Sequence, residues 1–210
     1  MMNIKGKFIT LEGGEGVGKT TNVPFIKNYL QSLNIPVVVT REPGGTQLAE
    51  KIRDLLLHAN DETVTSHAEI LLIFAARAQH LNHVIKPALV QGHWVLCDRF
   101  TDATYAYQGG GRGTPLEAIQ WLENFVQDDL RPDLTLLLDV PVETGMARAK
   151  NRGGGLDRFE SEHINFFNQV RQVYLQQAQQ YPERIKVIKA DQSLDIVQKA
   201  IVGALKPLLI

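Results

Sequence analysis

Five short apolar runs predict β-strands, and longer segments with helical periodicity separate them. The runs cover residues 7–11, 37–40, 94–97, 134–138 and 185–188. They are rich in Val, Leu and Ile and nearly continuous, which is typical of parallel strands that helices cover on both faces. The pattern predicts an α/β fold with a five-stranded parallel sheet flanked by helices. Ligands are then expected at the carboxyl ends of the strands.

The first run leads into a glycine-rich segment, Gly13 to Thr20, that matches the phosphate-binding pattern GxxxxGK[ST]. Glycines let successive backbone N–H groups turn toward a polyphosphate, and the positive end of the next helix faces the same ligand. In such a loop Lys19 reaches the β- and γ-phosphates and the Thr20 hydroxyl holds Mg²⁺. The strand before the loop and the helix after it favour this interpretation over a chance turn. The candidate ATP-binding residues are Gly13, Gly14, Glu15, Gly16, Val17, Gly18, Lys19, Thr20 and Thr21, with Asp191, Gln192 and Ser193 after the fifth strand.

The third strand ends in a carboxylate, Asp98, where many phosphate-loop proteins carry the acid that positions Mg²⁺. Apolar strands that end in Asp are common, and most of these residues cap a helix, but the phosphate loop favours the metal role here. Thr20 and Asp98 are therefore the candidate metal residues. A second phosphate-bearing substrate would need arginines, because a guanidinium group holds phosphate oxygens in pairs. The candidates are Arg41, Arg53, Arg77 and Arg99, with a surface charge as the default interpretation of Arg41 and Arg53.

Length and composition narrow the class of protein. The chain has 210 residues, 44% of them apolar, which predicts one domain over residues 1–210. A net charge of −1 indicates small-molecule partners rather than nucleic acid or a membrane surface. The single cysteine, Cys97, lies in an apolar run, so we expect a buried core thiol and no internal disulfide. With no signal-like N-terminus and no run of about 18 apolar residues, we expect a cytoplasmic protein.

Two glycine clusters, at residues 109–113 and 153–155, predict mobile loops. The second follows a basic helical segment, Met146 to Arg152, and we expect a mobile lid at about 148–160. Cations that close over the γ-phosphoryl group stabilise its charge, and closure excludes water. The alternative is a solvated basic helix end.

Together these motifs resemble the thymidylate (dTMP) kinases of the bacterial type. The resemblance rests on the segments 8–13, 40–46, 74–77, 98–100, 106–112, 132–135 and 156–160. It implies a phosphate-loop fold of the nucleoside monophosphate kinase type and transfer of the ATP γ-phosphoryl group to dTMP with Mg²⁺, giving dTDP and ADP. It also implies a homodimer, for which the apolar segment from His67 to Val90 could provide a helix face.

The resemblance also implies roles for individual residues. Arg77 and Gln108 would hold the thymine edge, Tyr107 would crowd the 2′ position, and Arg53 and Arg99 would bind the monophosphate. The implied dTMP-binding residues are Glu42, Pro43, Arg53, Ile73, Phe74, Arg77, Arg99, Thr104, Tyr107 and Gln108. Because Gly16 rather than arginine follows Glu15, the chain resembles the subtype whose catalytic arginine lies in the lid. The implied catalytic residues are Lys19, Glu15, Arg99, Arg148 and Arg152.

At two positions the chain departs from the family pattern. The aromatic residue that stacks on the base often lies four positions before the pocket arginine, where this chain has Ile73, with Phe74 next to it. We expect Phe74 to contact the base, with Ile73 as the alternative or as a core residue. The serine that is common five positions before the pocket glutamine is Ala103 here, which leaves Thr104 as the nearby hydroxyl.

Two other functions remain open from the sequence. A kinase for another nucleoside monophosphate would use the same loop, the Asp-Arg pair and the lid, although Tyr107, Gln108 and Arg77 favour dTMP. A regulatory nucleotide-binding switch would also carry a phosphate loop. The sequence has no Asn-Lys-x-Asp guanine-binding string, and a switch needs no second pocket lined by arginines.

Overall fold

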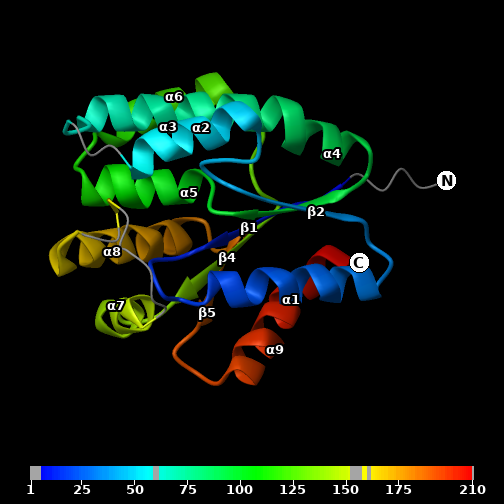
Figure 1. Ribbon diagram of the computed structural model, residues 1–210. Coiled ribbons are helices and arrows are strands. Elements are labelled where there is room, and N and C mark those ends of the chain that lie inside the picture. Colours follow the sequence, from blue (N-terminus) through cyan, green and yellow to red (C-terminus); the bar gives the residue numbers. More distant parts are fainter. Residues whose placement is uncertain (1–5, 59–61, 152–157, 160–161, 210) are drawn as a thin grey trace.

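A single five-stranded parallel sheet forms the centre of the molecule (Figure 1). The computed structural model describes residues 6–58, 62–151, 158–159 and 162–209. The strands are β1 (Phe8–Glu12), β2 (Val37–Arg41), β3 (Trp94–Asp98), β4 (Leu134–Asp139) and β5 (Ile185–Lys189), in the spatial order β2-β3-β1-β4-β5. The predicted sheet is confirmed, and each strand ends one residue later than the apolar pattern predicts.

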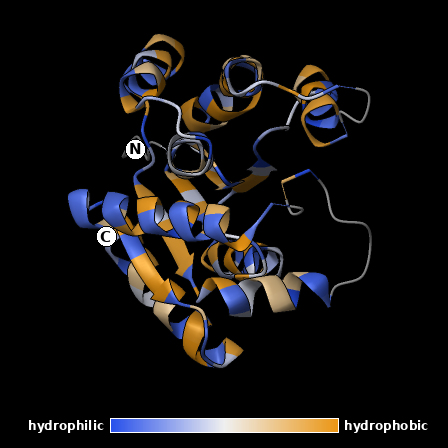
Figure 2. Cartoon of the chain, turned by 90° about the vertical axis from the view of Figure 1, so that its left-hand side faces the viewer, coloured by the Kyte–Doolittle hydropathy of each residue, from blue (hydrophilic) through white to orange (hydrophobic). Residues whose placement is uncertain are grey.

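The two faces of the sheet bury alternate residues of each strand. Ile9 and Leu136 pack against α1 (Lys19–Ser32) and α9 (Leu194–Leu205) on one face. Val95 and Leu137 point to the opposite face, where α4 (Lys86–Val90) and α8 (Ile164–Gln180) lie. Because helices cover both faces, the strands have no polar side, which explains their nearly continuous apolar sequence. Figure 2 shows strands that are mostly hydrophobic between helices that carry both colours.

The remaining helices lie mainly on the α4 side of the sheet. They are α2 (Gln47–Leu57), α3 (Ser66–His80), α5 (Thr101–Thr104), α6 (Leu116–Gln127) and α7 (Val142–Lys150), with the π-helices η1 (Leu81–Ile85) and η2 (Tyr105–Gly111) and the 3₁₀-helix η3 (Lys206–Leu209). Thr46 and Thr65 cap α2 and α3 by accepting the backbone N–H groups of Ala49 and Ala68. Helix α3 packs between α2 and α6, and the segment from 66 to 90 is helical throughout.

The prediction of a mobile loop at 109–113 is wrong for its first three residues. Gly109 to Gly111 form the last turn of η2, which packs against α8. A Cβ atom at Gly110 would lie 2.7 Å from Val173 Cγ2, and one at Gly111 would lie 2.3 Å from Phe166 Cε2. These glycines therefore allow two helical segments to approach closely, a purpose that the sequence alone does not distinguish from a turn. The second predicted loop, 153–155, lies outside the described residues.

No helix among the residues that the structure describes is long and apolar enough to cross a membrane.

Cys97 is buried in β3 and forms no disulfide, as predicted for a core thiol. Burial raises the pKa of this thiol well above the ordinary value.

Candidate active site

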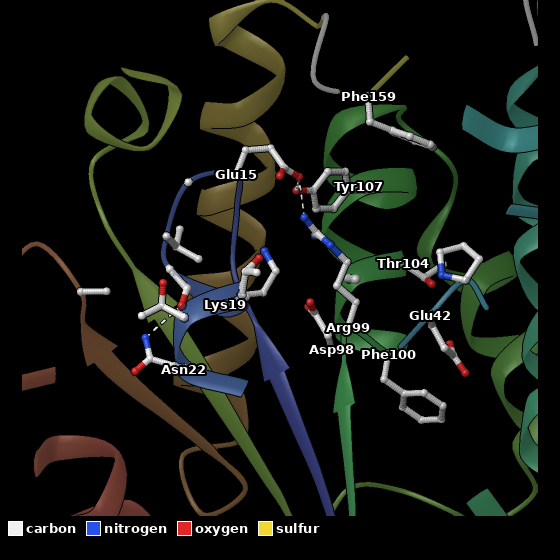
Figure 3. A pocket seen from close by; sticks show the side chains of 18 of the residues that line it. Glu15, Lys19, Asn22, Glu42, Asp98, Arg99, Phe100, Thr104, Tyr107 and Phe159 are labelled. Carbon is white, nitrogen blue, oxygen red and sulfur yellow. Dashed lines mark hydrogen bonds and ion pairs between the residues drawn. The ribbon is translucent and has the colours of Figure 1, made fainter. Parts of the chain in front are cut away.

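A cavity of about 590 Å³ lies at the carboxyl ends of the central strands β1 and β3 (Figure 3). The phosphate loop and the start of α1 form one end, which we call the donor end. Residues from α2, α3, the segment after β2, the segment after β3, α5 and η2 form the other, which we call the acceptor end. The cavity thus lies where parallel α/β sheets usually bind ligands.

At the donor end the loop adopts backbone conformations that favour glycine. Gly16 has φ 66° and Gly18, the N-cap of α1, has φ 98°. A Cβ atom at Gly16 would lie 1.9 Å from the carbonyl oxygen of Gly145, so the loop also needs glycine there for close packing on α7. Lys19 Nζ donates to the carbonyl oxygens of Gly13 and Gly14 at 3.0 and 2.8 Å. Burial and the nearby Arg99 lower the Lys19 pKa.

The predicted ATP-binding residues separate into two groups. Glu15 to Thr21 and Gln192 line the cavity. Gly13, Gly14, Asp191 and Ser193 are not among its described lining residues, and Ser193 instead precedes α9 as its N-cap.

One of the two predicted lid arginines reaches the donor end. Arg148, on α7, lines the cavity, and its Nη1 donates to the carbonyl oxygen of Ala190 at 3.0 Å. The other, Arg152, lies outside the described residues, together with much of the predicted lid.

The two predicted metal residues line the same cavity from opposite elements. Thr20 lies in the first turn of α1, and Asp98 ends β3. Asp98 Oδ1 is buried and has no hydrogen-bond partner in the part of the chain that the structure describes. In that part, no group of three or more His, Cys, Asp or Glu side chains could hold a metal by itself. A hydroxyl and one carboxylate fit Mg²⁺, which usually takes few protein ligands and completes its shell with water and substrate phosphates.

Arg99 crosses the middle of the cavity, between its two ends (Figure 3). Its backbone has φ 66°, an uncommon conformation for a residue other than glycine, and its guanidinium group is directed at Glu15 and Tyr107. Arg99 Nη2 lies 2.5 Å from Glu15 Oε1, and the guanidinium carbon lies 4.6 Å from the centre of the Tyr107 ring. The Tyr107 hydroxyl donates to the same Glu15 oxygen at 2.9 Å. Arg99 Nη1 is buried without a partner among the described side chains.

Arg77 reaches the acceptor end from α3 and is almost completely buried. Its Nε donates to Glu42 Oε2 at 2.7 Å, and its Nη2 donates to Thr104 Oγ1 at 2.9 Å. Glu42 Oε1 in turn lies 3.0 Å from Nδ1 of the buried His80. Arg77 Nη1 has no partner in the described region. Buried polar groups normally have a hydrogen-bond partner, so this N–H group is a candidate donor to a ligand or to an ordered water.

Most of the dTMP-binding residues that the resemblance implies come together here. The cavity is lined by Glu42, Pro43, Arg53, Ile73, Arg77, Arg99, Thr104, Tyr107 and Gln108. Phe74 is not among its described lining residues. It packs with Ile70 and Ile119, and its ring lies 4.7 Å from the Arg77 guanidinium carbon. The structure therefore favours Ile73 over Phe74 as the residue that faces the acceptor, because Phe74 lies on the core side of α3.

Arg41, the remaining candidate phosphate ligand, lies outside the cavity. It forms an exposed ion pair with Glu50, with 2.8 Å between Nη2 and Oε2, which confirms its default interpretation as a surface charge. Arg53 lines the cavity instead and donates from Nη1 to the Pro43 carbonyl oxygen at 3.0 Å.

Several residues that build the site had no role predicted from the sequence. Asn22, Phe100 and Phe159 line the cavity. Two buried carboxylates, Glu12 and Glu69, lie behind it and accept hydrogen bonds from residues that line it. The only sequence signal for Glu12 was its position as a charged residue at the end of an apolar strand. The only signal for Glu69 was its spacing of two helical turns from Arg77.

Glu12 supports the segment that carries Arg99. Its Oε1 accepts the Phe100 backbone N–H at 2.7 Å, and its Oε2 accepts the Tyr174 hydroxyl at 2.8 Å. Burial, with repulsion from Asp102, raises the Glu12 pKa to about 7.

A phosphate loop, a parallel sheet in this strand order and a second cavity end lined by arginines define an enzyme of the phosphate-loop nucleoside monophosphate kinase class. Comparison with known proteins identifies the family. The family model described as thymidylate kinase matches residues 11–201. The chain belongs to the thymidylate kinase family.

Individual relatives cover almost the whole chain. A thymidylate kinase of Pseudomonas putida strain F1 is 59% identical over 206 residues, which are 98% of each chain. One of Chromohalobacter salexigens is 59% identical over 201 residues, 95% of each chain. The crystal structure of thymidylate kinase from Ehrlichia chaffeensis superimposes with a TM-score of 0.77 at 34% identity, covering 95% of this chain and 98% of that one.

Proposed function

We propose that this enzyme transfers the γ-phosphoryl group of ATP to dTMP, giving dTDP and ADP. The observation that carries the proposal is a single cavity with a phosphate loop at one end and two arginines, the buried Arg77 and the partly buried Arg99, toward the other. Each arginine keeps one buried N–H group without a partner in the described region. A nucleotide phosphate and a base carbonyl are acceptors that would satisfy these donors.

The reaction needs positioning and positive charge more than acid–base chemistry. The acceptor phosphate is already a nucleophile near neutral pH, because its second pKa lies near 6. Lys19 would hold the β- and γ-phosphates, and Arg99 would align the acceptor phosphate for in-line attack. Thr20 and Asp98 would hold Mg²⁺, which when bound neutralises charge on the phosphate oxygens. Neither a covalent enzyme intermediate nor a general base is required.

The acceptor end fits a deoxyribonucleoside monophosphate. Arg77 Nη1 could donate to the O4 carbonyl of thymine, and Gln108 lies in the same wall. The Tyr107 ring, held by Glu15 and packed on Arg99, would occupy the space that a 2′-hydroxyl needs. Glu15 would lie near the 3′-hydroxyl and the acceptor phosphate.

The predicted lid would complete the charge around the transferred group. Arg148 already lines the donor end, and Arg152 lies four positions later in the sequence. Either arginine could stabilise the charge that spreads over the γ-phosphoryl oxygens, as an arginine finger does.

Arg152→Ala should lower kcat more than nucleotide affinity, and a pure effect on KM would contradict this role.

Acceptor-dependent release of ADP tests the proposal. Purified enzyme with ATP and Mg²⁺ is assayed with no acceptor, dTMP, dUMP, the ribose analogue of dTMP, dCMP, AMP and GMP. We expect strong turnover with dTMP and little without an acceptor. Turnover that favours AMP or GMP would indicate another nucleoside monophosphate kinase, and slow hydrolysis that no acceptor accelerates would indicate a nucleotide switch.

We also propose that the enzyme acts as a homodimer through the outer face of α2, α3 and α6, which lie side by side (Figure 1). Trp121 and Phe125 on α6 are 64% and 72% exposed, and their rings stack with centroids 5.3 Å apart. Leu71 on α3 and Leu55 on α2 are 57% and 60% exposed. Large, exposed apolar side chains on neighbouring helices are typical of a protein interface.

Light scattering after size exclusion tests the dimer. The wild-type protein should elute with twice the chain mass of 23.5 kDa. Trp121→Lys should shift it toward the monomer, whereas Val90→Lys, an exposed change away from α6, should not. A monomeric wild-type protein at micromolar concentration would contradict the proposal.

The cytoplasm is the proposed compartment. The unpaired, buried Cys97 supports a reducing environment, in which free thiols persist. Fractionation of cells that express the tagged chain would test this location.

A further inference from the structure

Glu69 on α3 is fully buried and accepts hydrogen bonds from three side chains behind the acceptor end. Gln108 Nε2 donates to its Oε1 at 2.8 Å, and Arg112 Nε lies 3.3 Å from the same oxygen. Arg158 Nη2 donates to Oε2 at 2.5 Å. Of these partners, only Gln108 lines the cavity among the described residues.

The carboxylate decides which way the Gln108 amide is turned. An ionised carboxylate only accepts hydrogen bonds, so the amide group must present its nitrogen to Glu69. The amide oxygen, Oε1, then has no side-chain partner in the described region, and Gln108 borders the cavity. Gln108 therefore offers the acceptor end a hydrogen-bond acceptor rather than a donor.

A second buried carboxylate fixes the complementary group. Glu42 holds Arg77 through Nε, and Arg77 Nη1 remains as a donor without a partner among the described residues. The wall of the acceptor end therefore combines a fixed donor, Arg77, with a fixed acceptor, Gln108. Each of them is set by a buried carboxylate: Glu42, which itself lines the cavity, and Glu69, which is not among the described lining residues.

We propose that Glu69 is a positioning residue that selects the base by fixing the amide orientation of Gln108. Thymine and uracil carry a carbonyl acceptor at position 4 and an N–H donor at position 3, which match the pair Arg77 and Gln108. Cytosine carries an amino donor at position 4 and an acceptor at position 3, so both contacts oppose it. Discrimination follows because a mismatched buried polar group loses its hydrogen bond. This inference rests on the proposed function, since it assumes that the base of the acceptor nucleotide lies against this wall.

The test is the ratio of kcat/KM for dTMP to that for dCMP, measured in the wild type and in Glu69→Gln. A glutamine at position 69 can present oxygen as well as nitrogen, so the Gln108 amide can turn and offer its NH₂ group to the cavity. We expect the dTMP/dCMP ratio to fall by roughly tenfold or more. The dTMP/dUMP ratio should stay within about twofold, because thymine and uracil share the same hydrogen-bonding edge. A merely structural defect would not change one ratio and spare the other.

Two further variants keep the test decisive. Arg112→Gln removes one cation from Glu69 but leaves its contact with Gln108, so both ratios should stay at the wild-type values. If Glu69→Gln does not fold, Glu69→Asp keeps the negative charge but withdraws the carboxylate from Gln108, and the dTMP/dCMP ratio should again fall.

Two different failures can be told apart. An unchanged dTMP/dCMP ratio in a folded Glu69 variant would overturn this inference and leave the kinase function intact. A wild-type enzyme that does not phosphorylate dTMP would overturn the proposed function itself.

Discussion

The two ends of the cavity are built in different ways. The donor end consists largely of one continuous segment, Glu15 to Thr21, whose glycines and helix N-terminus suffice to make an anion site. The acceptor end consists of buried side chains from separate elements, held by carboxylates: Arg77 by Glu42 and Gln108 by Glu69. The first end depends on local sequence and the second on tertiary packing.

This difference has an energetic consequence. A change in a donor-end side chain should affect catalysis with little effect on folding, because the backbone carries the geometry. A change at the acceptor end leaves a buried charge without its partner, so folding and substrate binding should suffer together. Substitutions at the two ends and between them test that contrast, from the largest expected effect to the smallest.

Lys19→Ala should lower kcat by at least about a hundredfold, because it removes a cation from the phosphates that carry charge in the transition state. The midpoint of thermal unfolding should change little, since in the described part of the chain the hydrogen bonds of Lys19 go to the loop carbonyls of Gly13 and Gly14. Steady-state kinetics and circular dichroism measure the two effects. Lys27→Ala, an exposed lysine on the same helix, is the matched control and should leave kcat unchanged. If Lys19→Ala kept most of its activity, the loop would not be the catalytic one.

Arg77→Ala should raise the KM for dTMP and also destabilise the fold by about 3–5 kcal/mol, because Glu42 stays buried without its cation. Denaturant unfolding measures the loss of stability, and steady-state kinetics measure the KM for dTMP. If Arg77→Ala does not fold, Arg77→Lys replaces it, because lysine keeps the charge but not the planar group. This variant should show a smaller rise in the KM for dTMP and a smaller loss of stability. An acceptor-end variant with impaired dTMP binding and unchanged stability would contradict the contrast between the two ends.

Glu12 lies at the boundary of the two ends, and its substitution should change the pH dependence of stability. The groups that face it are Lys19, Arg99, Asp102, Tyr174 and Arg184. Its folded-state pKa of about 7 exceeds the ordinary value of 4.5, so the folded protein binds more protons between these values. The stability that protonation contributes is present below about pH 4.5 and is lost as pH rises through about 7.

The wild type should therefore lose on the order of 2 kcal/mol of unfolding free energy relative to Glu12→Gln between pH 5 and pH 8. Urea unfolding at each pH measures the difference. Parallel curves for the two proteins would show that Glu12 does not titrate in this range.

Tyr107→Phe should have the smallest effect. It removes the hydroxyl that donates to Glu15 but keeps the ring under Arg99, so kcat/KM for dTMP should fall by about tenfold or less. The preference for deoxyribose over ribose should remain, because the ring still fills the same space. A variant that gained activity on the ribose analogue would show that the hydroxyl, rather than the ring, excludes the 2′-hydroxyl.

The same contrast explains how far the sequence could be interpreted. The strands and the phosphate loop could be predicted because their signals are local: apolar runs, glycines at fixed spacing and a following helix. Arg77 could be singled out only as one of four candidate arginines, and its place beside Tyr107 came from the resemblance, since no short-range pattern joins α3 to η2.

Other features could not be predicted because they depend on contacts between distant segments. Glycines at 109–111 look like a loop, yet Gly110 and Gly111 make room for α8. Phe74 and Ile73 share a helix, and only the packing of α3 on Ile119 shows that Phe74 faces the core. The carboxylate of Glu69 lies 39 residues away in sequence from the amide that it orients.

Calorimetric titration of dTMP into Lys19→Ala, without ATP, tests most directly the claim that the two ends are built independently. The account predicts that this variant binds dTMP with an affinity within about twofold of the wild type although it does not turn over, because the acceptor end keeps Arg77, Arg99 and their carboxylates. Loss of dTMP binding in a folded Lys19→Ala protein would contradict the account, since the acceptor end would then depend on the donor-end side chain of Lys19.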